Sequence, residues 1–141
     1  MVGTPATTAS PTTLAAVRDR YAGGVFLSGR STGGVAATAG VVSRFTSLAE
    51  RDLPLWVATD QEGGEVQVLR GPGFGAMPYG IRQADLPSDQ LQEKAEAWGR
   101  ELAEAGVNLD LAPVADIVTS KATRFDNPPI GGYGRQYGYD A

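Results

Sequence analysis

The 141-residue sequence contains neither cysteine nor histidine. Without cysteine the chain forms no disulfide and offers no thiolate ligand, although this absence does not identify a cellular compartment. Without histidine it lacks the side chain that most often acts as a general base or binds a metal ion. The sequence therefore predicts no metal site within the chain and implies no cofactor.

Long apolar runs and long basic runs are also missing. No stretch approaches the roughly 20 apolar residues of a transmembrane helix, so no membrane span is predicted. The net charge is −4, which makes a nucleic-acid backbone an unsuitable partner. Neither a basic start nor an apolar segment of the kind found in secretory signals follows Met1. The localisation is not predicted, because Met1-Val2-Gly3-Thr4-Pro5 resembles a strand end rather than a free terminus.

What the chain does contain is typical of a globular protein. Hydrophobic residues make up 42% of the sequence and charged residues 20%, and the length suffices for one domain with a core. The 19 glycines are concentrated at expected turns, which indicates many short loops.

The most informative segment is Thr59-Asp60-Gln61-Glu62-Gly63-Gly64, which follows a short apolar strand predicted at residues 55–58. Two carboxylates stand at the end of that strand, where a glycine pair permits a sharp turn. Ligands of α/β proteins bind at the carboxyl ends of parallel strands. Asp60 would accept hydrogens from hydroxyl groups, and Arg70, shortly downstream, would donate in a fixed fork. This chemistry suits a sugar, while Glu62 is interpreted as a loop carboxylate that pairs with a cation.

Strands and helices are expected to alternate along the chain. After the initial strand end, a helix capped by Thr12 or Thr13 leads to a strand at residues 25–27. A second helix, capped near Ser31 or Thr32, leads to the strand before Asp60. A third helix is expected from Ser88 to about Ala105, with Leu91, Trp98 and Leu102 on its apolar face. It is followed by a strand at residues 107–113 and, from residue 118, a long loop.

Repeated βα units imply a parallel sheet with right-handed crossovers. Two architectures fit: an open doubly wound sheet or a (β/α)8 barrel. A barrel usually needs about 250 residues, so this chain would supply about half of one. The long terminal loop favours the barrel, because a compact domain rarely ends in such a loop. The predicted fold class is α/β: the N-terminal half of a TIM (β/α)8 barrel with parallel strands, incomplete in this chain.

Five groups of motifs occur in an order that is informative as a whole. They are Met1-Val2-Gly3-Thr4-Pro5; Gly24-Val25-Phe26-Leu27; Thr59-Asp60-Gln61-Glu62-Gly63-Gly64 with Leu69-Arg70; Gly99-Arg100-Glu101-Leu102 with Ala112-Pro113-Val114-Ala115-Asp116; and Asn127-Pro128-Pro129-Ile130-Gly131 with Arg135-Gln136-Tyr137-Gly138. In this order they resemble the N-terminal part of family 3 glycoside hydrolases, in the β-N-acetylhexosaminidase branch. The chain departs from the usual pattern at Tyr137, where the family commonly has Phe, and in the longer spacing before Arg135.

The resemblance implies that residues 1–141 form a partial N-terminal barrel domain of about the first four βα units. It implies a retaining glycosidase acting on terminal β-linked N-acetylglucosamine. Asp60, Arg70 and Arg135 would bind the sugar. The nucleophile and a His–Asp acid/base pair are expected beyond Ala141, so the chain alone should be inactive and should need the remainder of its barrel as a partner.

Two other functions stay open at the level of sequence. A non-catalytic half-barrel would keep Asp60 and Arg70 and bind carbohydrate without cutting it. A doubly wound nucleotide-binding domain would need a phosphate loop, but Gly29-Arg30-Ser31-Thr32-Gly33-Gly34 lacks the required spacing and lysine. An isolated half-barrel with unpaired strand edges is expected to aggregate or to pair with a second copy.

Overall fold

The computed structural model describes residues 1–49 and 53–140. The strands within these ranges are β1 (Val2–Pro5), β2 (Gly24–Ser28), β3 (Trp56–Thr59), β4 (Gln61–Gly63), β5 (Val66–Gln67) and β6 (Leu109–Asp110). The helices are α1 (Pro11–Arg20), α2 (Gly34–Thr46), α3 (Gly80–Gln83) and α4 (Ser88–Glu104), with one π-helical turn, η1 (Pro128–Gly132).

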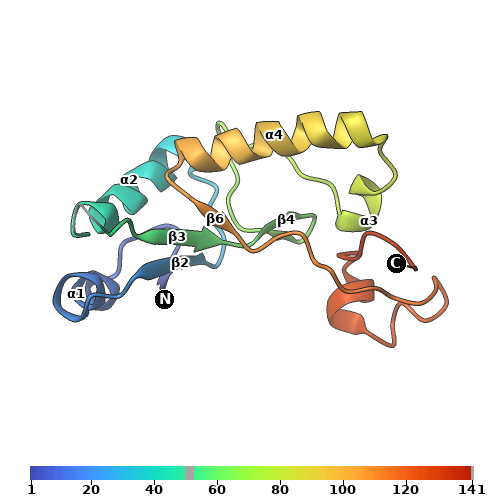
Figure 1. The fold of residues 1–141 in the computed structure, drawn as a ribbon, viewed down its shortest axis with the longest axis horizontal. Helices are drawn as coiled ribbons and strands as arrows, with labels where there is room; N and C mark the ends of the chain where they lie inside the picture. Colours follow the sequence, from blue (N-terminus) through green and yellow to red (C-terminus); the bar gives the residue numbers. More distant parts are fainter. Residues whose placement is uncertain (50–52, 141) are drawn as a thin grey trace.

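The predicted parallel sheet is present. Its strand order is β1-β2-β3-β6, and every neighbouring pair is parallel. Consecutive strands are joined through α1, α2 and α4, so the chain repeats a strand–helix unit (Figure 1). The carboxyl ends of the strands therefore meet at one edge of the sheet, where β4 and β5 form a separate antiparallel pair.

Apolar residues of the strands and helices form one cluster. Val25 and Leu27 of β2 and Val57 of β3 are almost completely buried in it. Phe45 of α2 and Leu102 of α4 are buried in the same cluster, so helices from separate βα units cover one hydrophobic core. Burial of a large apolar side chain contributes about 1.5–3 kcal/mol, which makes this core the main source of the sheet's stability.

The ends of two helices differ from the prediction. Ser10, rather than Thr12 or Thr13, caps α1, because its hydroxyl accepts a hydrogen bond from the Thr13 amide at 3.2 Å. Ser88 is the first residue of α4 and makes no side-chain cap; Pro87 occupies the cap position.

The strand predicted at residues 107–113 is much shorter in the structure. β6 comprises Leu109–Asp110 only. Asn108 lies before it and uses its side chain to accept a hydrogen bond from the Val57 amide at 2.8 Å and to donate one to the Leu55 carbonyl. The Asn108 side chain thus replaces part of the backbone hydrogen bonding between β3 and β6. The alternation of apolar residues does not predict this substitution.

Two tryptophans were expected to be buried, and neither is fully buried. Trp56 is the first residue of β3 and is 56% exposed, whereas the rest of the strand, Val57 to Thr59, is buried. Trp98 is half-buried on α4. Together with Leu91 and Met77 it lines an open groove of about 370 Å³, so only the C-terminal part of the apolar face of α4 is packed into the core.

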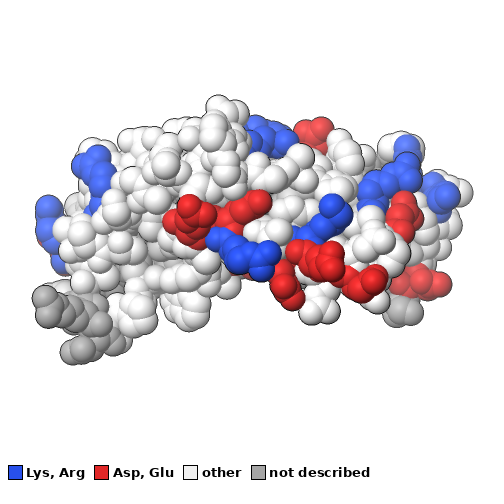
Figure 2. Space-filling view, turned by 90° about the horizontal axis from the view of Figure 1, so that it is seen from above, with Lys and Arg blue, Asp and Glu red and all other residues white. Residues whose placement is uncertain are grey.

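The outer surface carries charges of both signs. Acidic and basic side chains are interspersed on the face seen from above, where α4 lies, without an extended area of one sign (Figure 2). Among the residues that the structure describes, no helix has the length and hydropathy needed to cross a membrane.

Candidate functional site

Asp60 lies directly after β3, at the carboxyl edge of the sheet, as predicted. Its side chain is partly exposed and lines a cavity of about 210 Å³. Phe26 and Ser28 from the neighbouring strand β2 contribute to the same cavity, as does Glu65. The side chain of Asp60 thus faces a cavity at the surface and does not point into the core.

The carboxylate of Asp60 is partly buried and lies near a second negative charge, that of Glu62. Burial raises the pKa of Asp60, the charge of Glu62 raises this pKa further, and Arg135 acts to lower it. Among the described residues its carboxylate has no hydrogen-bond partner, although its backbone carbonyl accepts a hydrogen bond from the Val68 amide at 3.3 Å. The carboxylate oxygens are therefore available as acceptors for a ligand.

A tight hairpin follows Asp60. β4 and β5 are joined at Gly63 and Gly64, which have φ values of 103° and 55°. At Gly63 a Cβ would also collide with the carbonyl oxygen of Pro78. The predicted glycine turn is confirmed, and the antiparallel hairpin that it closes was not predicted, because each of its strands has only two or three residues.

Arg70 is held against this hairpin. Its Nε donates to the Gln67 carbonyl at 3.1 Å, and its Nη2 donates to the Gly64 carbonyl at 2.6 Å. These bonds orient the guanidinium and brace the turn after Asp60. Some of its five N–H groups remain free for other acceptors. The role of Arg70 in sugar binding stays a prediction.

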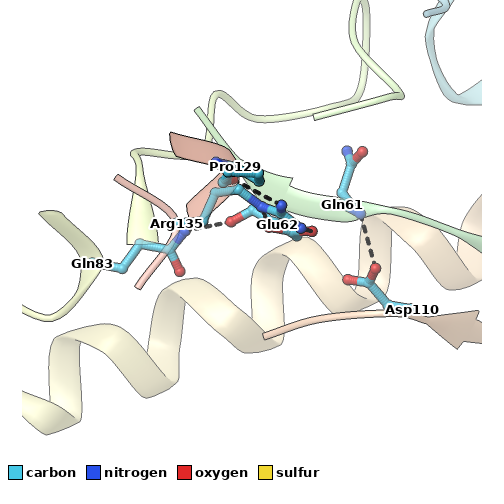
Figure 3. A network of polar contacts seen from close by, with 6 residues as sticks. All are labelled: Gln61, Glu62, Gln83, Asp110, Pro129 and Arg135. Carbon is cyan, nitrogen blue, oxygen red and sulfur yellow. Dashed lines mark hydrogen bonds and ion pairs between the residues drawn. The ribbon is translucent and has the colours of Figure 1, made fainter. Parts of the chain in front are cut away.

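Arg135 and Glu62, which are 73 positions apart in the sequence, form a partly buried ion pair. The Nε and Nη2 atoms of Arg135 donate to the two carboxylate oxygens of Glu62 at 2.8 and 2.7 Å. The side chains are 25% and 8% exposed, respectively. The prediction that Glu62 pairs with a cation is confirmed. Figure 3 shows the two side chains facing each other, with Arg135 also bound to the Pro129 carbonyl.

Gln83 connects the same parts of the chain through its amide. Its Nε2 donates to the backbone carbonyls of Glu62 and Pro78, both at 2.7 Å, and its Oε1 accepts a hydrogen bond from the Tyr137 hydroxyl. Gly80 allows a close approach nearby, because a Cβ there would collide with the Arg135 carbonyl oxygen. The short helix α3 therefore docks the segment around Arg135 onto β4.

Asp110 is a further carboxylate at the edge of the sheet. Its Oδ1 accepts a hydrogen bond from the Gln61 amide at 2.9 Å (Figure 3). Burial raises the pKa of Asp110, and the charges of Asp60 and Glu62 raise it as well, whereas the Gln61 amide lowers it. Asp110 thus ties β6 to β4 and adds negative charge beside Asp60.

The structure brings two of the three predicted sugar ligands together. Arg135 binds the side chain of Glu62, which stands two positions after Asp60, so Arg135 is held close to the segment that carries Asp60. Arg70 lies against the hairpin that follows Asp60. Gln83 was missed, because a glutamine in a Gly- and Pro-rich stretch carries no sequence signal. No group of three or more potential metal-ligating side chains occurs in residues 1–49 and 53–140.

Comparisons with known proteins agree on one family. The model of the glycosyl hydrolase family 3 N-terminal domain matches residues 3–132. A solved β-N-acetylhexosaminidase from Beutenbergia cavernae is 51% identical and superposes with a TM-score of 0.96; the match covers 99% of this chain and 43% of that protein.

Curated relatives are more distant. A β-hexosaminidase from Xylella fastidiosa is 30% identical over 151 residues, which cover 97% of this chain and 44% of the relative. The β-hexosaminidase LpqI of Mycobacterium tuberculosis is 34% identical over 89 residues, or 62% of this chain and 21% of that protein. The chain thus spans less than half the length of these relatives.

The predicted fold class is confirmed by this comparison. The parallel sheet and its helices match the Beutenbergia cavernae structure over nearly the whole chain, while covering less than half of that protein. This is the agreement expected for the N-terminal half of a (β/α)8 barrel.

Proposed function

We propose that this protein, whose chain belongs to glycosyl hydrolase family 3, is a retaining glycosidase that removes terminal β-linked N-acetylglucosamine. Within the proposal, residues 1–141 form part of the N-terminal barrel domain, about its first four βα units. They contribute a share of the sugar-binding site. The single observation that carries the proposal is the 51% identity, over 99% of the chain, to a β-N-acetylhexosaminidase.

Asp60 is the central ligand in this proposal. A carboxylate accepts hydrogen bonds from sugar hydroxyl groups, and such charge-assisted bonds are stronger than neutral ones. The cavity beside Asp60 and the absence of a hydrogen-bond partner for its carboxylate among the described residues support this role. Partial burial strengthens the interaction further, because water competes less well for the carboxylate.

Arg135 and Arg70 would donate hydrogen bonds to the same sugar. Arg135 enters from the loop after η1, and Arg70 from the hairpin, so the sugar would lie between two irregular segments above the strand ends. A neutral polyhydroxylated ligand fits this mixture of acceptor and donors better than an anion, because three carboxylates, Asp60, Glu62 and Asp110, gather here.

Retention requires a nucleophile and an acid/base group in addition to these ligands. Glu62 is unsuited to either role, since both of its oxygens are bonded to Arg135. The proposal therefore assigns the nucleophile and the acid/base pair to residues outside positions 1–141, and expects the 141-residue chain on its own to be inactive.

The test is hydrolysis of a chromogenic N-acetyl-β-glucosaminide by the natural protein that contains these residues. Turnover is expected for the wild type, and Asp60→Asn should reduce kcat/KM by at least about tenfold, because a charged acceptor is lost. Asp19→Asn, which changes an exposed carboxylate on α1 that does not line the Asp60 cavity, serves as the matched control. Binding of N-acetylglucosamine without turnover would instead favour a non-catalytic carbohydrate-binding protein.

A further inference from the structure

We propose that Glu62 is a positioning residue of the sugar site: it holds the Arg135 guanidinium in the one orientation that leaves terminal N–H groups free for the ligand. This inference rests on the proposed function, since it concerns how Arg135 meets a sugar. The role assigned to Glu62 is thus to orient Arg135 toward the ligand, in addition to neutralising its charge.

The contact between the two side chains has the geometry of a fixed fork. Nε and Nη2 of Arg135 each bind a different oxygen of Glu62, at 2.8 and 2.7 Å. Two parallel charge-assisted hydrogen bonds restrain rotation of the guanidinium as well as its distance from the carboxylate. The Glu62 side chain is only 8% exposed and is thus shielded from water, while Arg135, at 25%, keeps part of its surface accessible.

The remaining donors of Arg135 can be counted. A guanidinium has five N–H groups. Two of them bind Glu62, and one on Nη1 binds the Pro129 carbonyl at 3.1 Å, so 5 − 3 = 2 remain. Both belong to the terminal nitrogens, one on Nη1 and one on Nη2. Glu62 therefore decides which edge of Arg135 a ligand can meet.

Glu62 is in turn fixed by its own surroundings. It belongs to β4, and its backbone carbonyl accepts the hydrogen bond from Gln83. Arg135, by contrast, lies outside any helix or strand, and its backbone is held by single hydrogen bonds, such as the one from its amide to the Ile130 carbonyl at 3.1 Å. Glu62, which is held in a strand, thus orients the long side chain of Arg135. Precise ligand sites require support of this kind from neighbouring residues.

A different role for Glu62 is excluded by the same contacts. A carboxylate with both oxygens bound to a guanidinium does not serve as a proton donor. Loss of the Glu62 charge would leave the partly buried Arg135 guanidinium without its partner, and it would also remove a charge that acts on Asp60. A double-mutant cycle with Arg135 separates the two effects.

The test is a double-mutant cycle in the natural protein, with KM and kcat for the chromogenic N-acetylglucosaminide measured separately. Glu62→Gln should raise KM on the order of tenfold, as expected for the loss of a charged hydrogen bond, and change kcat less. Arg135→Met should raise KM at least as much. In the Arg135→Met background, Glu62→Gln should raise KM much less than it does in the wild type, because residues that act as one unit are not additive.

The matched control is the exposed pair of Glu96 and Arg100 on α4, whose charged atoms are 3.7 Å apart. Glu96→Gln and Arg100→Met make the same chemical changes and should leave KM unchanged. If Glu62→Gln does not fold, Glu62→Asp is used; it keeps the charge and should raise KM less than Arg135→Met does.

The outcomes separate the two proposals. A wild-type protein that neither binds nor hydrolyses N-acetylglucosaminides would overturn the proposed function. An active wild type in which Glu62→Gln leaves KM unchanged would overturn the positioning role alone. Equal effects of Glu62→Gln with and without Arg135 would also overturn it, because Glu62 would then act independently.

Discussion

Two regions of the structure are stabilised by different interactions: the regular end, from Val2 to Asp110, and the irregular end, from Ala112 to Asp140. Between Ala6 and Val107, apolar side chains of strands and helices form a common cluster. Among the described residues, this cluster has no member after Val107. The segment from Ala112 to Asp140 lies at the far end of the molecule from α1 and α2 (Figure 1) and is attached by polar contacts of Arg135 and Tyr137.

The difference matters because each end supplies one part of the candidate site. Asp60 belongs to the regular end: it follows β3 directly, and the core fixes the position of β3. Arg135 is carried by the irregular end, where Glu62 and Gln83 determine its position. The candidate site therefore combines Asp60, whose position depends on packing, with Arg135, whose position depends on hydrogen bonds. The two residues should respond differently to mutations in the core and in the polar contacts.

The largest effect is expected in the apolar core. Phe45 on α2 is completely buried, so Phe45→Ala should lower the free energy of unfolding by about 3–5 kcal/mol through lost transfer energy and a cavity. Urea denaturation of the natural protein measures this loss. Phe125, which is 61% exposed in the irregular segment, is the control, and Phe125→Ala should change stability by less than about 1 kcal/mol. Equal losses would contradict the distinction between the two ends.

A smaller effect is expected where α3 meets the Arg135 segment. At Gly80 an added Cβ would collide with the Arg135 carbonyl oxygen, so Gly80→Ala should destabilise the protein by about 1–3 kcal/mol and weaken sugar binding. Gly99 on α4 is the matched control, because nothing lies within 4 Å of its added Cβ. Gly99→Ala should stabilise the helix by about 0.5–1 kcal/mol, and thermal unfolding together with binding calorimetry distinguishes the two variants.

A pH-dependent effect is expected at Asp110. Its pKa is raised in the folded state, chiefly by burial, so its contribution to stability is fully present below the pKa of the unfolded chain and is lost as the pH rises through the folded pKa. Asp110→Asn removes this dependence while keeping an oxygen that accepts the Gln61 amide hydrogen. The variant should gain stability relative to the wild type at neutral pH and lose that gain near pH 3. Urea denaturation at both pH values measures the difference, and a gain of the same size at both would contradict the assigned cause.

The smallest effect is expected on the surface of α4. Glu96→Ala breaks an exposed contact of 3.7 Å with Arg100 and should change the free energy of unfolding by less than about 0.5 kcal/mol. A loss as large as that of a buried-pair variant, measured by the same denaturation, would show that exposure is a poor guide to the strength of ion pairs in this protein.

The sequence predicts the regular end well, because its signals are local. The apolar residues around Val25 and Val57 indicate strands, and the position of Asp60 follows from the strand before it. Predictions failed where a distant contact decides the structure. The strand at 107–113 is shortened to Leu109–Asp110, and its edge bonds through Asn108 instead.

The irregular end is the part that sequence patterns describe least. The family motif identifies Arg135 as a candidate ligand, and the cation pairing of Glu62 was expected. That these two residues are each other's partner was not, because 73 positions separate them and no periodic pattern links them. Gln83 and α3 were missed for the same reason, since a four-residue helix in a loop produces no repeat.

The most direct test of the sugar site is a crystal structure of the natural protein with bound N-acetylglucosamine. We predict a carboxylate oxygen of Asp60 within about 3 Å of a sugar hydroxyl, with an Nη atom of Arg135 on the same sugar. A sugar bound elsewhere, with no atom of Asp60 in hydrogen-bonding distance, would contradict the account.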